Sequence, residues 1–259
     1  LAPVASMSLY TNYGSKWSFI TAAACTVVSI ILTQFLSFKN VPAAPTPVET
    51  AQKKPRRKFS DVFSTRGLIF FPMLLADGFQ NGVLDLVVVV YATALGIPEA
   101  GAFFFSVQAI VTVCLAIPFG FIQDKFGGKV SVIIAFLCRG IGCLLIAVSP
   151  TYTSFVVAGI LCGTAKPGNN VLQTDAMKLQ PRSHFGIASS THLLLCDFSV
   201  MIGSAVGGYL VDYAGGYSVC FTVAGIILIA GAVVYFLMQP AIQKMINAAA
   251  TLDGVAEAN

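Results

Sequence analysis

Seven long apolar stretches dominate this sequence and limit what it can fold into. Each is close to the roughly 20 residues that a helix needs to cross the hydrocarbon core of a bilayer. They lack the polar–apolar alternation of barrel strands, and backbone groups in lipid must be paired internally, so we expect helices. The stretches are residues 17–38, 67–93, 102–123, 130–149, 152–177, 185–211 and 218–238.

The composition also indicates a membrane protein. Only 10% of the 259 residues are charged and 56% are hydrophobic, whereas a soluble domain carries about 25% charged residues. The net charge of +4 is too small to suggest a nucleic-acid partner, so the expected surroundings are a lipid bilayer. The sequence therefore predicts an all-α membrane protein with about seven transmembrane helices.

Basic residues occur in every second connection between these stretches, which predicts the orientation of the chain. The positive-inside rule places the basic connections and the C-terminus in the cytoplasm and the N-terminus outside. Lys or Arg occurs at 39–66, 123–129, 178–184 and in the tail, and is missing from 96–101, 149–154 and 211–218.

We expect four parts along the chain, divided by the proline-rich and basic connection. Prolines at 42, 45, 47 and 55 oppose a continuous helix there. The chain begins at Leu1, and its first 16 residues lack the basic segment and apolar core of a signal peptide, so we expect an N-terminally truncated chain. The parts are a first helix (1–38), a cytoplasmic linker (39–66), a six-helix bundle (67–240) and a cytoplasmic tail (241–259).

The segment GFIQDKFGGKV, residues 120–130, carries a more specific signal. Glycines allow a tight turn between two helices. The segment resembles motif A of the major facilitator superfamily of transporters, although Gln123 replaces a small residue and Gly128 shifts the second basic residue by one. The resemblance implies a conformational latch, in which Asp124 accepts hydrogen bonds from a helix N-terminus. The residues that fit the motif are Gly120, Asp124, Lys125, Gly127 and Lys129.

The resemblance extends over most of residues 13–240. Segments 75–110 and 169–221 resemble drug:proton antiporter-like members, the second through features that include Gln173, Gly203 and the pair Gly207–Gly208. It implies a partial fold of this family, equivalent to family helices 6–12, whose partner is an N-terminal half that is missing or lies in another chain. It also implies alternating access around a midplane site, a small-molecule substrate, a proton as coupling ion and no cofactor.

Ionisable residues inside apolar stretches are the candidates for the transport pathway, because they are costly in a membrane. Asp77, Asn81 and Asp85 follow one another at a spacing of four residues, which places them near one helical face. A carboxylate in such surroundings could exchange a proton, and a cation could hold an anionic substrate or pair with an acid. The further candidates are Lys166, Asn170, Gln173, Asp197 and Arg139, and we expect a kink at Pro167. His192 is interpreted as a packing residue or one at the cytoplasmic leaflet.

Other classes of protein fit the sequence less well. We find no GxSxG, Walker A, HExxH or dinucleotide-binding motif, so no enzyme is indicated. The seven cysteines make no CxxC pair, so no metal site is indicated. Two alternatives stay open: a seven-helix receptor-type protein, although residues 218–238 lack the lysine of a retinal protein, and a half-transporter that acts only as a scaffold. A static buried ion pair is the alternative for each charged candidate.

Overall fold

The computed structural model describes residues 15–35, 64–180 and 184–257. The chain divides into two compact units, Ala2–Lys58 and Phe59–Asn259, which we describe separately. The boundary falls in the expected linker, of which residues 39–63 lie outside the described part. The described residues of the first unit form one helix, α2 (Ser15–Phe35), on the predicted span 17–38. Its side chains Thr21, Thr26 and Ser29 bond to carbonyls one turn back, which satisfies their hydroxyls within the helix.

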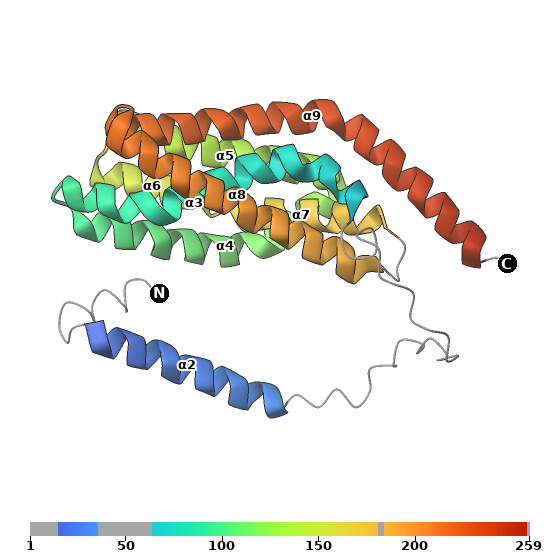
Figure 1. The fold of residues 1–259 in the computed structure, drawn as a ribbon, viewed down its shortest axis with the longest axis horizontal. Coiled ribbons are helices and arrows are strands. Elements are labelled where there is room, and N and C mark those ends of the chain that lie inside the picture. Colours follow the sequence, from blue (N-terminus) through green and yellow to red (C-terminus); the bar gives the residue numbers. More distant parts are fainter. Residues whose placement is uncertain (1–14, 36–63, 181–183, 258–259) are drawn as a thin grey trace. The chain divides into compact units, whose positions relative to one another are not determined.

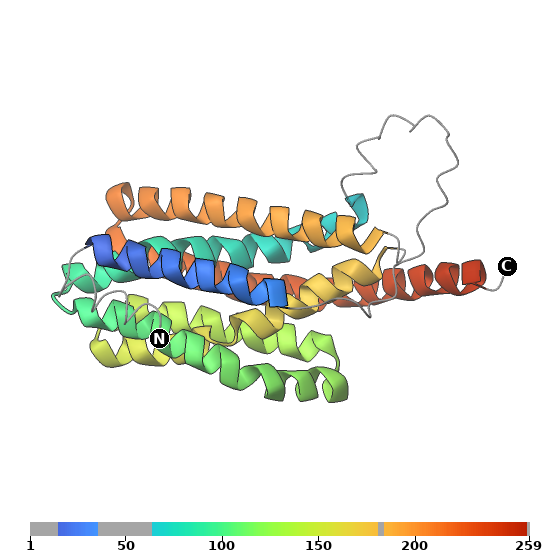
Figure 2. The same ribbon diagram turned by 90° about the horizontal axis from the view of Figure 1, so that it is seen from below.

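The second unit is a bundle whose long helices run side by side (Figures 1 and 2). All its described elements are helical, and five are long and apolar enough to cross a membrane. The predicted spans from 67 onward all fall on helices, which confirms the helical membrane fold. The elements are η2 (Thr65–Phe70), α3 (Phe71–Ala94), α4 (Pro98–Phe126), α5 (Gly128–Val148), α6 (Tyr152–Cys162), α7 (Ala165–Lys178), α8 (Phe185–Tyr213) and α9 (Gly216–Glu257).

The predicted span 152–177 is two helices, because α6 ends at Cys162 and α7 begins at Ala165. The expected kink at Pro167 is wrong. Pro167 is the third residue of α7, where the backbone N–H would have no partner within the helix, so proline is tolerated. The interruption instead lies at Gly163 and Thr164, where the Thr164 hydroxyl donates to the Leu161 carbonyl at 2.8 Å.

The last helix extends well past the predicted span 218–238. α9 continues to Glu257 through most of the segment that was expected to form a tail, and it changes direction in Figure 1. Pro240 lies inside α9, and proline removes one backbone hydrogen bond and bends a helix. Ile242 beyond it is buried, so the first turns after the proline still pack against the bundle.

Two apolar clusters fill the bundle, and a set of polar side chains lies between them. The first cluster includes Phe79, Val83 and Cys143, and the second includes Met73 and Phe136. Asp77 and Gln80 come between Ala76 of the second cluster and Val83 of the first along α3, and Arg139 comes between Phe136 and Cys143 along α5. Polar residues of α3 and α5 therefore lie between the two apolar clusters, at the same level of the bundle.

Small residues bring α3 and α8 close together. A Cβ added at Gly203 would lie 2.6 Å from the Phe79 Cα, and one at Gly82 would lie 2.7 Å from the Ser204 backbone nitrogen. The Ser204 hydroxyl also donates to the Gly82 carbonyl at 3.2 Å. Close backbone approach at glycines is how membrane helices associate, since lipid gives no hydrophobic drive. This packing fixes where α3 presents its polar residues.

The turn between α4 and α5 depends on one glycine conformation. Gly127 follows the last residue of α4 with φ of 81° and donates its N–H to the Gln123 carbonyl at 2.9 Å. Residues with a Cβ avoid this left-handed region. We expect Gly127→Ala to lower the free energy of unfolding by about 1 kcal/mol, measured by denaturant titration in detergent micelles. Gly120→Ala, where a Cβ would meet nothing within 4 Å, is the control; an equal loss in both variants would contradict this explanation.

Candidate functional site

The centre of the polar set is an ion pair between α3 and α5. Arg139 Nη1 donates to Asp77 Oδ1. The two residues are almost completely buried, with exposed fractions of 0% for Arg139 and 2% for Asp77. Removing two charges from water costs several kcal/mol per ion, and their attraction offsets this only when further hydrogen bonds complete the arrangement. The surrounding amides provide such bonds to Arg139 Nη2 and to the Asp77 carboxylate, whereas Arg139 Nε is buried without a hydrogen-bond partner among the described residues.

Two amide side chains on α3 hold the guanidinium group. Arg139 Nη2 donates to Gln80 Oε1 and, at 2.8 Å, to Asn81 Oδ1. Asn81 Nδ2 then donates to Asp77 Oδ2 at 3.1 Å. Residues three and four positions apart lie on the same face of a helix, so Asp77, Gln80 and Asn81 meet Arg139 together. The fixed fork of the guanidinium group suits several planar acceptors at once.

The network continues to two further helices through Asn169 of α7 and His192 of α8. Asn169 Nδ2 donates to Asp77 Oδ2 at 3.5 Å, and Asn169 Oδ1 lies 3.0 Å from His192 Nε2. Because that amide oxygen can only accept, Nε2 must carry the proton in this arrangement. The Nδ1 atom of His192 is then left buried without a hydrogen-bond partner among the described residues.

We name this set the polar layer: Asp77, Gln80, Asn81, Arg139, Asn169 and His192. Four helices, α3, α5, α7 and α8, contribute to it. A buried ionic network inside a membrane bundle is a functional hypothesis by default, because an apolar replacement would often be at least as stable. Its carboxylate can bind a proton, and its free histidine nitrogen can accept one.

The sequence-predicted residues divide between this layer and other places. Asp77, Asn81 and Arg139 belong to it, whereas Asp85 and Asp197 are exposed and do not. Asp85 comes eight residues after Asp77, and with 3.6 residues per turn this rotates it by about 80° around the helix. Gln173 instead links α7 to α8 by donating to the Ser189 hydroxyl at 3.0 Å. The side chain of Lys166 lies outside the described residues.

Sequence reasoning missed part of the layer. Gln80 was not singled out, although its place three residues after Asp77 is a usable signal. His192 was interpreted as a packing or leaflet residue, but it is 3% exposed and bonded to Asn169. Nothing in the sequence shows that α8 turns His192 toward α7, because that depends on how the helices pack.

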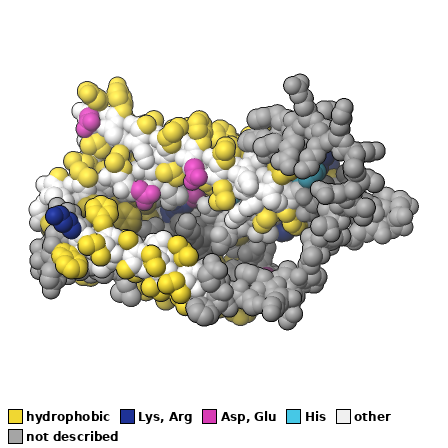
Figure 3. Space-filling model, turned by 60° about the horizontal axis from the view of Figure 1, so that its bottom comes forward, with side chains coloured by type: hydrophobic (Ala, Val, Ile, Leu, Met, Phe, Trp, Pro, Cys, Tyr) yellow, Lys and Arg dark blue, Asp and Glu magenta, His cyan; other side chains and the backbone are white. Residues whose placement is uncertain are grey.

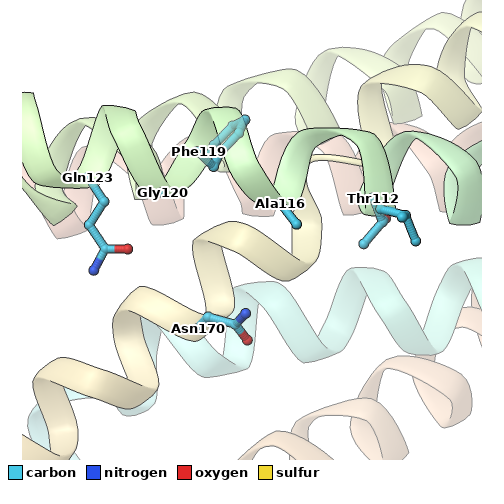
Figure 4. Close-up of a pocket in the computed structure, with 7 residues that line it drawn as sticks. Thr112, Ala116, Phe119, Gly120, Gln123 and Asn170 are labelled. Atoms are coloured by element: carbon cyan, nitrogen blue, oxygen red, sulfur yellow. The ribbon is translucent and has the colours of Figure 1, made fainter.

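Asn170 lies in a different place, a pocket of about 320 Å³ between α4 and α7. Figure 4 shows the Gln123 side chain extending from α4 toward α7, on which Asn170 lies, with Ala116 and Thr112 further along α4. Gly120 of the predicted latch also lines this pocket. The pocket therefore adjoins both the motif-like turn and the helix that carries Asn169.

The other residues of the turn lie toward the surface. Asp124 and Lys125 are exposed, and the Lys125 ammonium lies 5.5 Å from the centre of the Phe126 ring. Lys129 Nζ lies 4.2 Å from the centre of the Phe236 ring, which ties the start of α5 to α9 by a cation–π contact. The hydrogen bond from a helix N-terminus to Asp124 stays a prediction.

The surface of the bundle suits lipid. On the face shown in Figure 3, hydrophobic side chains are spread over the described surface and charged side chains are few. Large apolar side chains such as Val113, Phe121 and Leu237 are more than two thirds exposed. Among the residues that the structure describes, no group of three or more His, Cys, Asp or Glu could hold a metal ion.

Comparison with known proteins decides the family. The model of the Major Facilitator Superfamily matches residues 70–253. The chain belongs to the Major Facilitator Superfamily. The resemblance indicated by the motif-like turn is thereby confirmed, and the seven-helix receptor alternative is rejected. The family and the apolar helices together make the chain an integral, multi-pass membrane protein.

Relatives in this superfamily carry the name "Putative multidrug resistance protein MdtD". Those of Salmonella newport (strain SL254) and Salmonella typhi are each 27% identical over 177 residues, covering 64% of this chain and 37% of theirs. That of Salmonella paratyphi B is 28% identical over 139 residues, covering 52% of this chain and 29% of its own. The chain thus spans well under half the length of these relatives.

Proposed function

We propose that this chain is part of a secondary active transporter of a small molecule, and that the polar layer is its proton-exchange site. The superfamily and the named relatives support transport rather than an enzymatic reaction. The observation that carries the proposal is the buried pair of Asp77 and Arg139 within a network that reaches four helices. Efflux of drug-like molecules in exchange for protons is the specific form that the relatives favour.

The chemistry follows from the charges of the layer. With Asp77 ionised, the carboxylate and the Arg139 guanidinium neutralise each other. A proton on Asp77 would leave Arg139 as an uncompensated buried cation, which is strongly unfavourable. The protein would respond by exposing Arg139 to water or to an acceptor on the substrate, so the proton and the conformation are thermodynamically linked. Alternating access needs such a linkage.

The setting of the transporter is part of the proposal. The distribution of Lys and Arg supports a cytoplasmic linker and C-terminus, and the bacterial relatives support a plasma (inner) membrane. The partner of this bundle would be the N-terminal half of the same transporter, because alternating access moves one half against the other around a midplane site.

Replacing Asp77 tests the proposal in the intact transporter. We expect Asp77→Asn to abolish ethidium efflux from cells, at least a hundredfold, because the amide cannot exchange the proton. The substitution also leaves Arg139 without its buried partner, so the free energy of unfolding should fall. Membrane insertion, followed by the amount of protein in the membrane fraction, should stay unchanged. Glu99→Gln, an exposed acid in the first turn of α4, is the control and should transport normally.

Two outcomes would count against the proposed transport function. Normal efflux by Asp77→Asn would refute the proton-exchange role of this residue. If the unmodified protein and every variant also failed to transport any of a panel of cationic and neutral dyes, a non-transporting scaffold would be the better explanation.

A further inference from the structure

Asn169 joins two side chains of the polar layer that can each bind a proton. Its Nδ2 atom donates to Asp77 Oδ2 at 3.5 Å, and its Oδ1 atom lies 3.0 Å from His192 Nε2. One end of a side-chain amide only donates and the other end only accepts. The orientation of Asn169 therefore requires an unprotonated Asp77 oxygen on one side and an N–H group on the other.

A proton on Asp77 would replace one particular hydrogen bond of this arrangement. Oδ1 of Asp77 lies against the Arg139 guanidinium group, whose positive charge disfavours a proton there, so the proton adds to Oδ2. Oδ2 already accepts from Asn81 at 3.1 Å and from Asn169 at 3.5 Å, and an oxygen of this kind has two lone pairs. The proton would therefore displace the longer bond, which comes from Asn169.

The displaced bond has a consequence at His192. The new O–H group of Asp77 needs an acceptor, and Asn169 provides its Oδ1 atom when the amide turns over. Asn169 Nδ2 then faces His192 Nε2, which has to accept and cannot carry a proton, so the ring proton lies on Nδ1. His192 stays neutral in both states. Nδ1 takes up one proton, and the proton that leaves Nε2 balances the one that Asp77 gains.

We propose that Asn169 and His192 form a hydrogen-bond chain that reverses its direction when Asp77 is protonated. The reversal would transmit the protonation of α3 to α7 and α8, in addition to the effect on Arg139 of α5. Asn169 and His192 act through Asp77, so they are positioning residues. The inference rests on the proposed proton exchange, because without a proton on Asp77 the chain would not reverse.

The elements that pack against α8 carry further charged residues. Asp77 of α3 acts electrostatically on the His192 ring. The side chain of Lys166, three residues before Asn169 on α7, lies outside the described residues, so its contribution has to be measured with a variant. The other charged residues of these elements whose side chains are described are Arg66, Asp85, Asp175, Lys178 and Lys244.

Two spectroscopic signals test the proposal in the intact transporter, reconstituted in lipid vesicles and titrated to acidic pH. With histidine labelled by ¹³C and ¹⁵N, solid-state NMR distinguishes the Nε2–H tautomer, the Nδ1–H tautomer and the imidazolium ion, and the His192 signal is assigned by its loss in His192→Gln. Infrared difference spectroscopy follows the carboxyl C=O band of Asp77, assigned by its loss in Asp77→Asn. We expect the main tautomer of His192 to change from Nε2–H to Nδ1–H over the pH range in which this band appears.

Variants separate the chain from a static contact. The tautomer change should disappear in Asp77→Asn and in Asn169→Ala. It should persist in Asn170→Ala, which changes the next residue, an exposed one outside the polar layer, and in Lys166→Met.

The outcomes distinguish this inference from the proposed function. An Asp77 band that appears while His192 keeps its tautomer would overturn the hydrogen-bond chain and leave proton exchange standing. A tautomer change that survives in Asn169→Ala, or that is lost in Lys166→Met, would also overturn the chain. No Asp77 band at any pH at which the protein is folded would refute proton exchange by Asp77, and the chain with it.

Discussion

Replacing Arg139 with methionine is expected to lower the free energy of unfolding by about 3–5 kcal/mol. The substitution keeps an unbranched side chain of similar length but removes the partner of Asp77. The carboxyl group is then left without a cationic partner in a site that is 2% exposed, with only the amides of Asn81 and Asn169 donating to it. Gln80 would also lose its guanidinium donor. Equilibrium unfolding in mixed micelles of a mild detergent and sodium dodecyl sulfate would measure the loss.

The double variant Asp77→Asn/Arg139→Gln separates the ion pair from the packing of the two side chains. Both new side chains are neutral and can bond to each other and to Gln80 and Asn81. We expect the double variant to recover at least half of the stability that Arg139→Met loses, since no uncompensated charge remains. A loss below about 1 kcal/mol in Arg139→Met, the size of an exposed ion pair, would show that the two charges are not buried together.

Gly203→Val is expected to prevent normal folding of the bundle. A Cβ at this position would lie 2.6 Å from the Phe79 Cα, and the atom it meets belongs to the backbone, which cannot rotate away. Overpacking in a core costs about 1–3 kcal/mol and occasionally more, and here α3 and α8 would have to separate along their contact. The displaced α3 carries Asp77, Gln80 and Asn81, so transport should be lost together with stability. Yield of monodisperse protein and Tm measure the effect.

Gly208→Ala on the same helix is the matched control. A Cβ there would meet only the Leu86 Cδ2 atom at 3.9 Å, an ordinary contact. We expect its Tm to stay within a few degrees of that of the unmodified protein. If Gly203→Val and Gly208→Ala were equally stable, the close approach of α3 and α8 would be incorrect, and the arrangement of the polar layer with it.

The helices could be predicted from the sequence because hydropathy and length act locally. Each apolar stretch had to satisfy its own backbone in lipid, so all seven stretches fall on helices. The interruption after Cys162 was not found, because Gly163 and Thr164 resemble many other positions in these helices. Only close packing against α4 distinguishes Gly163, where an added Cβ would lie 2.6 Å from the Val111 Cγ1 atom.

Part of the candidate site could be predicted from the sequence, because a charged residue in an apolar stretch is also a local signal. Asp77 and Arg139 stand out because charge is rare in an apolar stretch, and that signal needs no knowledge of packing. Their pairing, and the contributions of Gln80, Asn169 and His192, depend on which faces of four helices meet. Asp85 and Asp197 are exposed on α3 and α8, and their place in a transport pathway stays a prediction.

Proton exchange by the polar layer is tested most directly in proteoliposomes that contain the intact transporter and a trapped pH-sensitive dye. Ethidium is added to the unmodified protein and to the double variant Asp77→Asn/Arg139→Gln, after unfolding experiments have shown that this variant is folded. The unmodified protein should move protons against ethidium, and the folded double variant should move none. A double variant that exchanges protons at the unmodified rate would contradict the assignment of proton exchange to Asp77 and Arg139.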